Sequence, residues 1–248
     1  MKILAIGNSF SQDAFKYLHN VSVAGGHDVT TVNLYIGGCT LEHHWNNVLE
    51  NKDEYQYQLN GLGEGPAATI KDTLNECKWD VISLQQASGY SGIDNSYHPY
   101  IENLYKYVRE FQPDAKIMIH ETWAYEHDSN HGHFKWYGKN QEYMFKALQN
   151  CYYNASYSLQ ADIIPCGDFI QHLRRTIPEF DYPKGGLSLT RDGFHMGYIY
   201  GRYALACIWY KYVVGGDVST NTFVPRGDSD IDPDMNLVNT IKTEAAKF

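Results

Sequence analysis

The feature that most constrains the fold is a regular alternation of short apolar runs with longer amphipathic stretches. The first run, Lys2–Ile6, and the second, Val29–Tyr35, are rich in aliphatic and β-branched residues and are followed by glycines, as buried strands often are. Parallel neighbouring strands need a long crossover connection, which is usually a helix. The alternation therefore predicts a three-layer α/β/α fold with a mostly parallel, five-stranded sheet. The expected strands are Lys2–Ile6, Val29–Tyr35, Val81–Leu84, Lys116–Ile119 and Asp162–Pro165.

The stretches between these runs predict the helices that cover the sheet. Tyr55–Leu59 instead alternates with period two, which indicates part of a small hairpin, and a polar, histidine-rich insertion spans 121–136. We expect the segment 216–233 to be a loop. The expected helices are Asp13–Val23, Ala67–Cys77, Tyr97–Phe111, Asn140–Leu159, Phe169–Thr176, Tyr198–Tyr212 and a last one from Asp234.

The length of the chain limits the number of domains. Its 248 residues are enough for one sizeable hydrophobic core and few for two. No internal repeat or low-complexity linker divides the sequence. We expect one domain over residues 1–248, with a core at about 2–212 and a C-terminal tail at 213–248.

Charge and cysteine usage narrow the partners and the compartment. The formal net charge of -9 disfavours nucleic acid, whose binding needs a concentrated positive surface. No stretch approaches the ~20 apolar residues that span a bilayer, so we expect no membrane partner. The five cysteines are scattered without a C-x-x-C pair, which fits a reducing compartment. The apolar opening is too brief for a signal peptide. The expected location is cytoplasmic, or secreted or periplasmic if a native leader has been removed.

Four motifs should meet at the carboxyl edge of the sheet, where ligands of parallel sheets bind. Gly7-Asn8-Ser9, Gly37-Gly38 and Gln85-Gln86 follow the first three strands, and Asp192-Gly-Phe-His195 precedes the last core helix. Each alone has an ordinary explanation as a turn, a helix cap or a polar strand end. Together they supply a hydroxyl, backbone amides, a side-chain amide and an Asp/His pair, which are the groups that acyl transfer requires.

In these motifs the sequence resembles the SGNH (GDSL-like) hydrolases, whose fold is flavodoxin-like. Gly7-Asn8-Ser9 matches the Gly-Asp-Ser nucleophile motif of that family, Gly37 or Gly38 its isolated glycine, and Asp192-Gly-Phe-His195 its Asp-x-x-His motif. The resemblance covers Lys2 to about Tyr212. The wording Ala-Ile-Gly-Asn-Ser-Phe-Ser, His-Glu-Thr-Trp-Ala-Tyr and Leu-Thr-Arg-Asp-Gly-Phe-His is also similar to the DUF4886 proteins, an uncharacterised bacterial subgroup.

The resemblance implies a serine esterase. Ser9 would be the nucleophile, His195 its general base and Asp192 the group that orients the imidazole. The backbone amides of Ser9 and Gly38 would belong to the oxyanion hole. The implied substrates are small acyl esters, above all acetyl esters, and O-acetylated carbohydrates, with no cofactor and no metal.

One block departs from the family pattern. Where the family has Gly-x-Asn-Asp, with an Asn that donates to the oxyanion, this sequence reads Leu84-Gln85-Gln86-Ala87-Ser88. A glutamine carries the same amide donor on a longer arm. Either Gln85 or Gln86 is a candidate third donor, because neighbouring strand residues point to opposite faces. The sequence does not indicate the oligomeric state.

The insertion offers two interpretations. We expect it to line the rim of the cleft, where His120, Trp123 and Tyr125 would contact the substrate together with Asn8. The alternative is a zinc site, since His127, Asp128, His131 and His133 crowd this segment and His43-His44 form a second pair. The glycine-rich segments match neither a dinucleotide-binding fingerprint nor a P-loop.

A different class of function also fits the sequence. Because fold alone does not prove activity, the chain could be a non-catalytic carbohydrate-binding or scaffold protein that retains the hydrolase fold. The presence of Ser9, Asp192 and His195 opposes this alternative, and the altered third block keeps it open.

Overall fold

The central strand of the sheet is the one that carries the serine motif. In a computed structural model that describes residues 1–227 and 232–248, β1 (Lys2–Gly7) pairs in parallel with β2 (Thr30–Tyr35) on one side and β5 (Val81–Leu84) on the other. Every residue of β1 after Lys2 is buried, as expected for a parallel strand covered on both faces. Parallel pairing continues through β6 (Lys116–His120) to β7 (Ile163–Ile164).

The sheet has seven strands instead of the five expected, in the order β4-β3-β2-β1-β5-β6-β7. The two additional strands, β3 (Tyr55–Leu59) and β4 (Ala67–Ala68), pair antiparallel beside β2. The period-two segment Tyr55–Leu59 is therefore the second strand from one edge of the main sheet, and β4 is the edge strand. Antiparallel neighbours need only a short connection, so no helix separates these two strands and the alternation of runs and helices did not reveal them.

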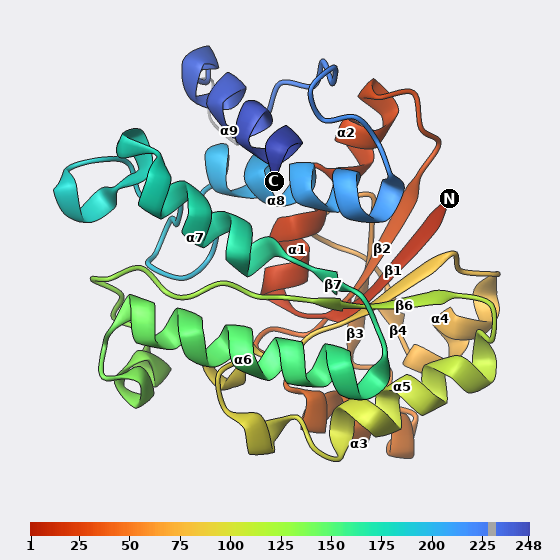
Figure 1. Ribbon diagram of the computed structural model, residues 1–248. Helices are drawn as coiled ribbons and strands as arrows, with labels where there is room; N and C mark the ends of the chain where they lie inside the picture. The colour runs from red at the N-terminus through yellow and green to blue at the C-terminus, as the bar shows by residue number, and fades with distance from the viewer. Residues whose placement is uncertain (228–231) are drawn as a thin grey trace.

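The helices form two layers, one on each face of the sheet (Figure 1). One layer contains α3 (Leu41–Glu50), α4 (Ile70–Glu76), α5 (Tyr100–Phe111) and α6 (Gln141–Leu159). The other contains α1 (Ser9–Phe15), α2 (Leu18–Ala24), α7 (Cys166–Thr176), α8 (Tyr200–Trp209) and α9 (Met235–Lys247). The predicted α/β/α architecture is confirmed.

Several helix boundaries differ from the prediction. The expected helix Asp13–Val23 is two helices, because α1 begins at Ser9, directly after its cap Asn8, and ends before α2 starts at Leu18. The expected helix Ala67–Cys77 begins only at Ile70, where Thr69 caps it. The helix expected from Tyr198 ends in a π-helical segment, Tyr210–Val214. Of the expected loop 216–233, residues 228–231 lie outside the described residues.

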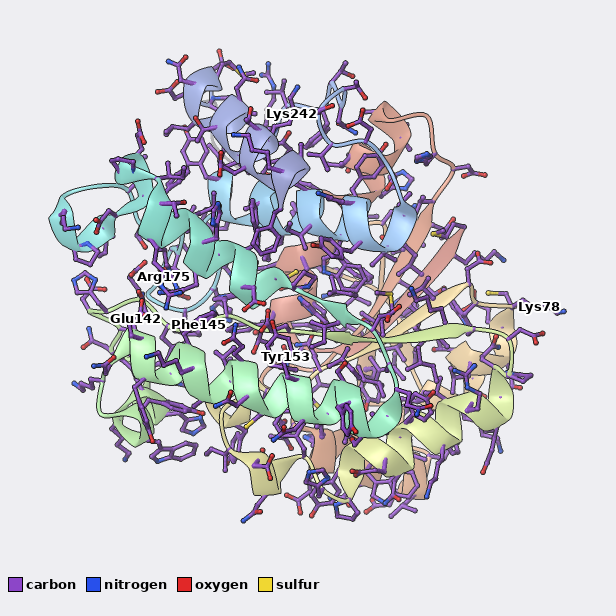
Figure 2. All side chains as sticks on the ribbon, in the orientation of Figure 1. Lys78, Glu142, Phe145, Tyr153, Arg175 and Lys242 are labelled. Atoms are coloured by element: carbon purple, nitrogen blue, oxygen red, sulfur yellow. The ribbon has the colours of Figure 1, made fainter. Side chains whose placement is uncertain are left out.

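Two further helix contacts complete the packing: α9 lies against α8, and α6 lies against α7. Helix α9 packs against α8 and buries Leu237, Val238 and Ile241 in the hydrophobic cluster. Arg175 of α7 forms an ion pair with Glu142 of α6, and its guanidinium carbon lies 4.9 Å from the ring centre of Phe145 (Figure 2). No helix in the described part of the chain has both the length and the apolar character needed to cross a bilayer.

Candidate active site

Ser9 lies where the central strand passes into the first helix. Asn8 has extended backbone angles and caps α1 by accepting a hydrogen bond from Phe10 N at 3.0 Å. Ser11 Oγ accepts one from Asn8 N at 3.0 Å, so the two side chains form a reciprocal capping box. This cap starts the helix at Ser9 and fixes that residue at the carboxyl edge of β1.

The Asp-x-x-His motif forms a tight turn before α8. Thr190 and Met196 form an antiparallel bridge, Arg191 N donates to His195 O at 2.9 Å, and Gly193 has a φ of +88°. Positive φ is easily adopted only by glycine. Within this turn Asp192 Oδ1 accepts hydrogen bonds from the backbone N–H groups of Phe194 (3.2 Å) and His195 (2.8 Å). The turn thus holds the carboxylate and the imidazole together.

The three predicted side chains meet in space. His195 Nδ1 lies 2.7 Å from Asp192 Oδ2, and His195 Nε2 lies 2.9 Å from Ser9 Oγ. Burial opposes ionisation of Asp192, but hydrogen bonds from the His195 side chain and backbone outweigh it and lower the pKa of this carboxyl below its usual value. An ionised carboxylate at Nδ1 favours the tautomer in which Nδ1 bears the proton and Nε2 can accept the hydroxyl proton of Ser9.

The two expected backbone donors of an oxyanion hole belong to neighbouring segments. Gly38 has a φ of +65°, and a Cβ placed on it would meet no atom within 4 Å. The residue after it, Cys39, accepts a hydrogen bond from Asn8 Nδ2 at 3.1 Å. Since Asn8 directly precedes Ser9, this bond holds the loop of Gly38 beside the serine.

The two glutamines are both turned into the protein. Gln85 Nε2 donates to Asn8 Oδ1 at 2.8 Å, and Gln86 Nε2 donates to Ser96 O (2.8 Å) and Ser96 Oγ (3.1 Å). Both side chains are buried. The prediction that one of them supplies a third oxyanion donor is therefore wrong for Gln86, which uses both of its amide hydrogens, and the amide of Gln85 is engaged with Asn8.

The glutamines instead brace the segments that carry Ser9 and Gly38. Gln85 holds the cap residue Asn8. Gln86 Oε1 accepts a hydrogen bond at 3.1 Å from the backbone N–H of Leu41, just beyond the Gly38 loop. Side-chain amides that satisfy buried backbone groups make a segment rigid. Their role in the structure is therefore to support the site.

The four residues expected to touch substrate are buried as well. Asn8, His120, Trp123 and Tyr125 are each at most 1% exposed. Trp123 stacks on Phe10 with ring centres 4.2 Å apart, and Tyr125 OH lies 2.9 Å from Ser88 Oγ. These side chains support the site from within, because the core closes over them, and the expectation that they line the rim is wrong.

His120 illustrates why such a side chain stays inside. Its Nδ1 lies 2.8 Å from Gln85 Oε1, which can only accept, so Nδ1 carries the proton. Burial lowers the pKa of His120 to about 3. The imidazole is therefore neutral at pH 7 and forms the inner end of a hydrogen-bonded chain that runs through Gln85 to Asn8.

Sequence reasoning placed the insertion at the rim but did not single out the rings that lie nearer the surface beside Ser9, Asp192 and His195. A row of aromatic and imidazole rings runs outward from His195 through Phe194 (ring centres 4.2 Å apart) to His131, which lies 4.6 Å from Phe194. Beyond it stand His133, Tyr90 and Trp136, of which Trp136 is 42% exposed. His133 and Trp136 stack 4.0 Å apart at 12°. We name these six residues the ring row: His195, Phe194, His131, His133, Tyr90 and Trp136.

The available sequence signal for this row was the spacing of His131, His133 and Trp136 in the insertion. They belong to or directly precede a 3-10 helix, Gly132–Tyr137. Burial lowers the pKa of both His131 and His133, and for His131 the nearby His133 and His195 act in the same direction. Both imidazoles are therefore neutral at pH 7.

The histidines considered as zinc ligands have other neighbours. His127 lies 3.6 Å from Glu126, His43 lies 3.2 Å from Glu54, and buried His44 stacks on Tyr55. Within residues 1–227 and 232–248, no group of three or more His, Cys, Asp or Glu side chains is arranged to hold a metal ion.

Comparisons with known proteins identify the family of the chain. The family model named domain of unknown function DUF4886 matches residues 2–241. The crystal structure of a DUF4886 family protein from Bacteroides uniformis ATCC 8492 is 35% identical, with a TM-score of 0.87 over 100% of this chain and 93% of that chain. No curated protein matches the sequence.

More distant structures share the fold. A proposed SGNH hydrolase from Slackia heliotrinireducens has a TM-score of 0.58 at 17% identity, over 85% of this chain and 97% of that chain. An acetyl xylan esterase has a TM-score of 0.54 at 13% identity, over 86% of this chain and 100% of that chain. The chain therefore has the fold of the SGNH hydrolases and belongs to the DUF4886 family.

Proposed function

We propose that the protein is a serine esterase that hydrolyses small acyl esters, with acetyl esters first among them. The observation that carries the proposal is the pair of contacts made by His195, 2.9 Å to Ser9 Oγ and 2.7 Å to Asp192 Oδ2. Nucleophile, base and orienting carboxylate at hydrogen-bond distance are the arrangement that activates a serine.

In the proposed reaction, Ser9 Oγ attacks the ester carbonyl while His195 Nε2 takes the hydroxyl proton. His195 then gives that proton to the departing alcohol, and Asp192 stabilises the imidazolium without becoming protonated. Water, activated by the same imidazole, attacks the acyl-enzyme, releases the acid and restores Ser9. Asp192 and His195 belong to the same turn, so their position relative to each other is fixed locally.

The oxyanion would be held by the backbone N–H groups of Ser9 and Gly38. Since the side-chain amides of Gln85 and Gln86 are bound within the protein, we propose a hole with two donors. Loss of one donor typically costs ~10²–10³ in rate. We therefore expect slow turnover on unactivated esters and better turnover on aryl acetates, whose leaving group is more acidic.

An O-acetylated carbohydrate is the proposed natural substrate class. The ring row offers flat apolar faces beside neutral imidazoles, and a sugar presents both an apolar face and hydroxyl groups. The shared fold with an acetyl xylan esterase is consistent with this substrate. A non-catalytic carbohydrate-binding or scaffold role predicts the same surface but no reactive serine.

The test is covalent labelling with a fluorophosphonate, together with hydrolysis of a short-chain aryl acetate. We expect the wild type to be labelled and to hydrolyse the ester, and Ser9→Ala to lose both with an unchanged circular dichroism spectrum. Ser158→Ala is the matched control, because its hydroxyl donates only to Ala155 O of the same helix. Full activity in Ser9→Ala would remove the nucleophile assignment, and an unreactive wild type would favour the binding protein.

A further inference from the structure

Helix α1 carries a buried carboxyl group that the proposed reaction does not use. Asp13 lies one helical turn after Ser9 and is 0% exposed. Burying a carboxylate without partners is costly, so the groups that surround it show what the structure uses it for.

The carboxylate of Asp13 receives hydrogen bonds from two other elements. Arg191 Nη1 donates to both of its oxygens, at 2.9 and 3.0 Å, and Met196 N donates to Oδ2 at 2.8 Å. Arg202 Nε of α8 donates to Oδ1 at 2.8 Å. Arg191 and Met196 flank the turn that holds Asp192 and His195. Asp13 therefore binds both ends of that turn.

The arginines are themselves held in place. Arg191 Nη1 also donates to Met196 O across the turn. The guanidinium carbons of Arg191 and Arg202 lie 5.2 and 4.9 Å from the ring centre of Tyr198, within the range of cation–π contacts. The connection from α1 to the turn is thus made of charged, nearly water-free contacts.

Of the two contacts that His195 makes, only the one with Ser9 depends on such a connection. Asp192 and His195 are three residues apart and share one turn, so their hydrogen bond is local. Ser9 and His195 are 186 residues apart, and their 2.9 Å contact depends on how the turn is seated against α1. A misplacement of about 1 Å between reacting groups can cost 10²-fold in rate.

We propose that Asp13 is a positioning residue: through Arg191 and Met196 N it seats the turn of Asp192 and His195 on the helix that begins with Ser9. It sets the distance from Ser9 to His195 and leaves the bond between His195 and Asp192 unaffected. This inference rests on the proposed function, since it assigns a task within the same triad.

The experiment compares Asp13→Asn and Arg191→Gln with the wild type. Arg191→Gln is included because Asp13→Asn leaves partly buried Arg191 and buried Arg202 facing a neutral group and risks unfolding, whereas Arg191→Gln keeps the pair of Asp13 with Arg202. Arg109→Gln is the matched control. Arg109 also fastens a loop, through hydrogen bonds of 2.7 Å to Pro113 O and Ala115 O, but at the opposite edge of the sheet.

Three quantities are measured: the maximal rate of fluorophosphonate labelling, the concentration that half-saturates it, and the downfield proton resonance of His195 Nδ1. For Arg191→Gln we expect the maximal rate to fall by at least about tenfold. The half-saturating concentration and the His195 resonance should stay unchanged. Arg109→Gln should label like the wild type.

Two results would overturn the inference: a folded Arg191→Gln that labels at the wild-type rate, or a slow variant in which the His195 resonance has also vanished. The second result would mean that the arginine shapes the turn itself. If the wild type does not react with the probe, the proposed function fails, and the inference falls with it. Failure of the inference alone is recognised by a reactive wild type.

Discussion

The side chains nearest to the outer surface of the site combine one carboxylate with several imidazole and aromatic rings. Asp192 is an ionised acceptor at 2.7 Å from Nδ1 of His195, the proposed base. His131 and His133 are neutral at pH 7 because burial lowers the pKa of both. A neutral imidazole can both donate to and accept from a hydroxyl group. Together with the partly exposed ring of Trp136, these histidines suit an uncharged, hydroxyl-rich substrate.

Trp136→Ala tests this interpretation at a single residue. Stacking contacts of aromatic rings contribute about 0.5–1.5 kcal/mol, which corresponds to about a 2- to 10-fold change in affinity. We expect KM for an acetylated xylo-oligosaccharide to rise by this factor, and kcat/KM for a small aryl acetate to stay unchanged. Steady-state kinetics on both esters measures the effect. Tyr157→Ala removes an exposed ring on α6 and is the control, and equal losses on both esters would contradict the prediction.

At the scale of elements, the first turn of helix α7 donates a hydrogen bond to a buried carboxyl group. Glu121 directly follows β6 and is 0% exposed. Its Oε2 accepts a hydrogen bond from Asp168 N at 2.8 Å in the first turn of α7, whereas Oε1 has no hydrogen-bond partner among residues 1–227 and 232–248. Burial and the nearby Asp168 raise the pKa of Glu121 well above its usual value, against the effect of the backbone hydrogen bonds. The side chain is therefore protonated in the folded protein where it would be ionised in the unfolded chain.

Glu121→Gln should make the free energy of unfolding less sensitive to a rise in pH. Above the unfolded pKa of about 4.3, the folded wild type binds a proton that the unfolded chain has lost, so its stability falls by about 1.4 kcal/mol per pH unit from this group. Glutamine resembles the protonated acid and removes this dependence. The free energy of unfolding of the variant, relative to wild type, should rise with pH between 5.5 and 7.5 in urea titrations. A constant difference would show that Glu121 is ionised in the fold.

Elements of the parallel sheet and the meeting of Ser9, His195 and Asp192 could be predicted from the sequence, because each motif depends on local pattern. Gly7-Asn8-Ser9 and Asp192-Gly-Phe-His195 carry their own caps and turns, so short segments fix their geometry. The environments of Gln85 and His120 could not be predicted. Whether a polar side chain at a strand end faces the cleft or the core depends on distant partners such as Asn8 and on the rings packed over it.

For the whole molecule, the free energy of unfolding depends on pH through buried groups in different layers that act in opposite directions. His44 on α3 and His120 on β6 are both 0% exposed, and burial lowers the pKa of each to about 3. Below the unfolded pKa of about 6.5, the unfolded chain binds protons at these positions and the folded protein does not. Stability from the two histidines is therefore present at pH 7 and is lost as the pH falls. Glu121 acts in the opposite direction over the same range.

The pH dependence of the wild-type free energy of unfolding should therefore equal the contribution of about one buried histidine. Each buried histidine contributes a slope of about 1.4 kcal/mol per pH unit between pH 6 and 5, and Glu121 offsets one of them. His44→Gln should flatten the dependence toward zero, and Glu121→Gln should steepen it to about 3 kcal/mol per pH unit. Half-exposed His131 and His133 add a smaller effect of the same sign, because water screens them. Urea unfolding of the three proteins at pH 6 and 5 gives the slopes. Equal slopes would mean that these buried groups do not control the acid stability of the fold, whatever their effect on stability at pH 7.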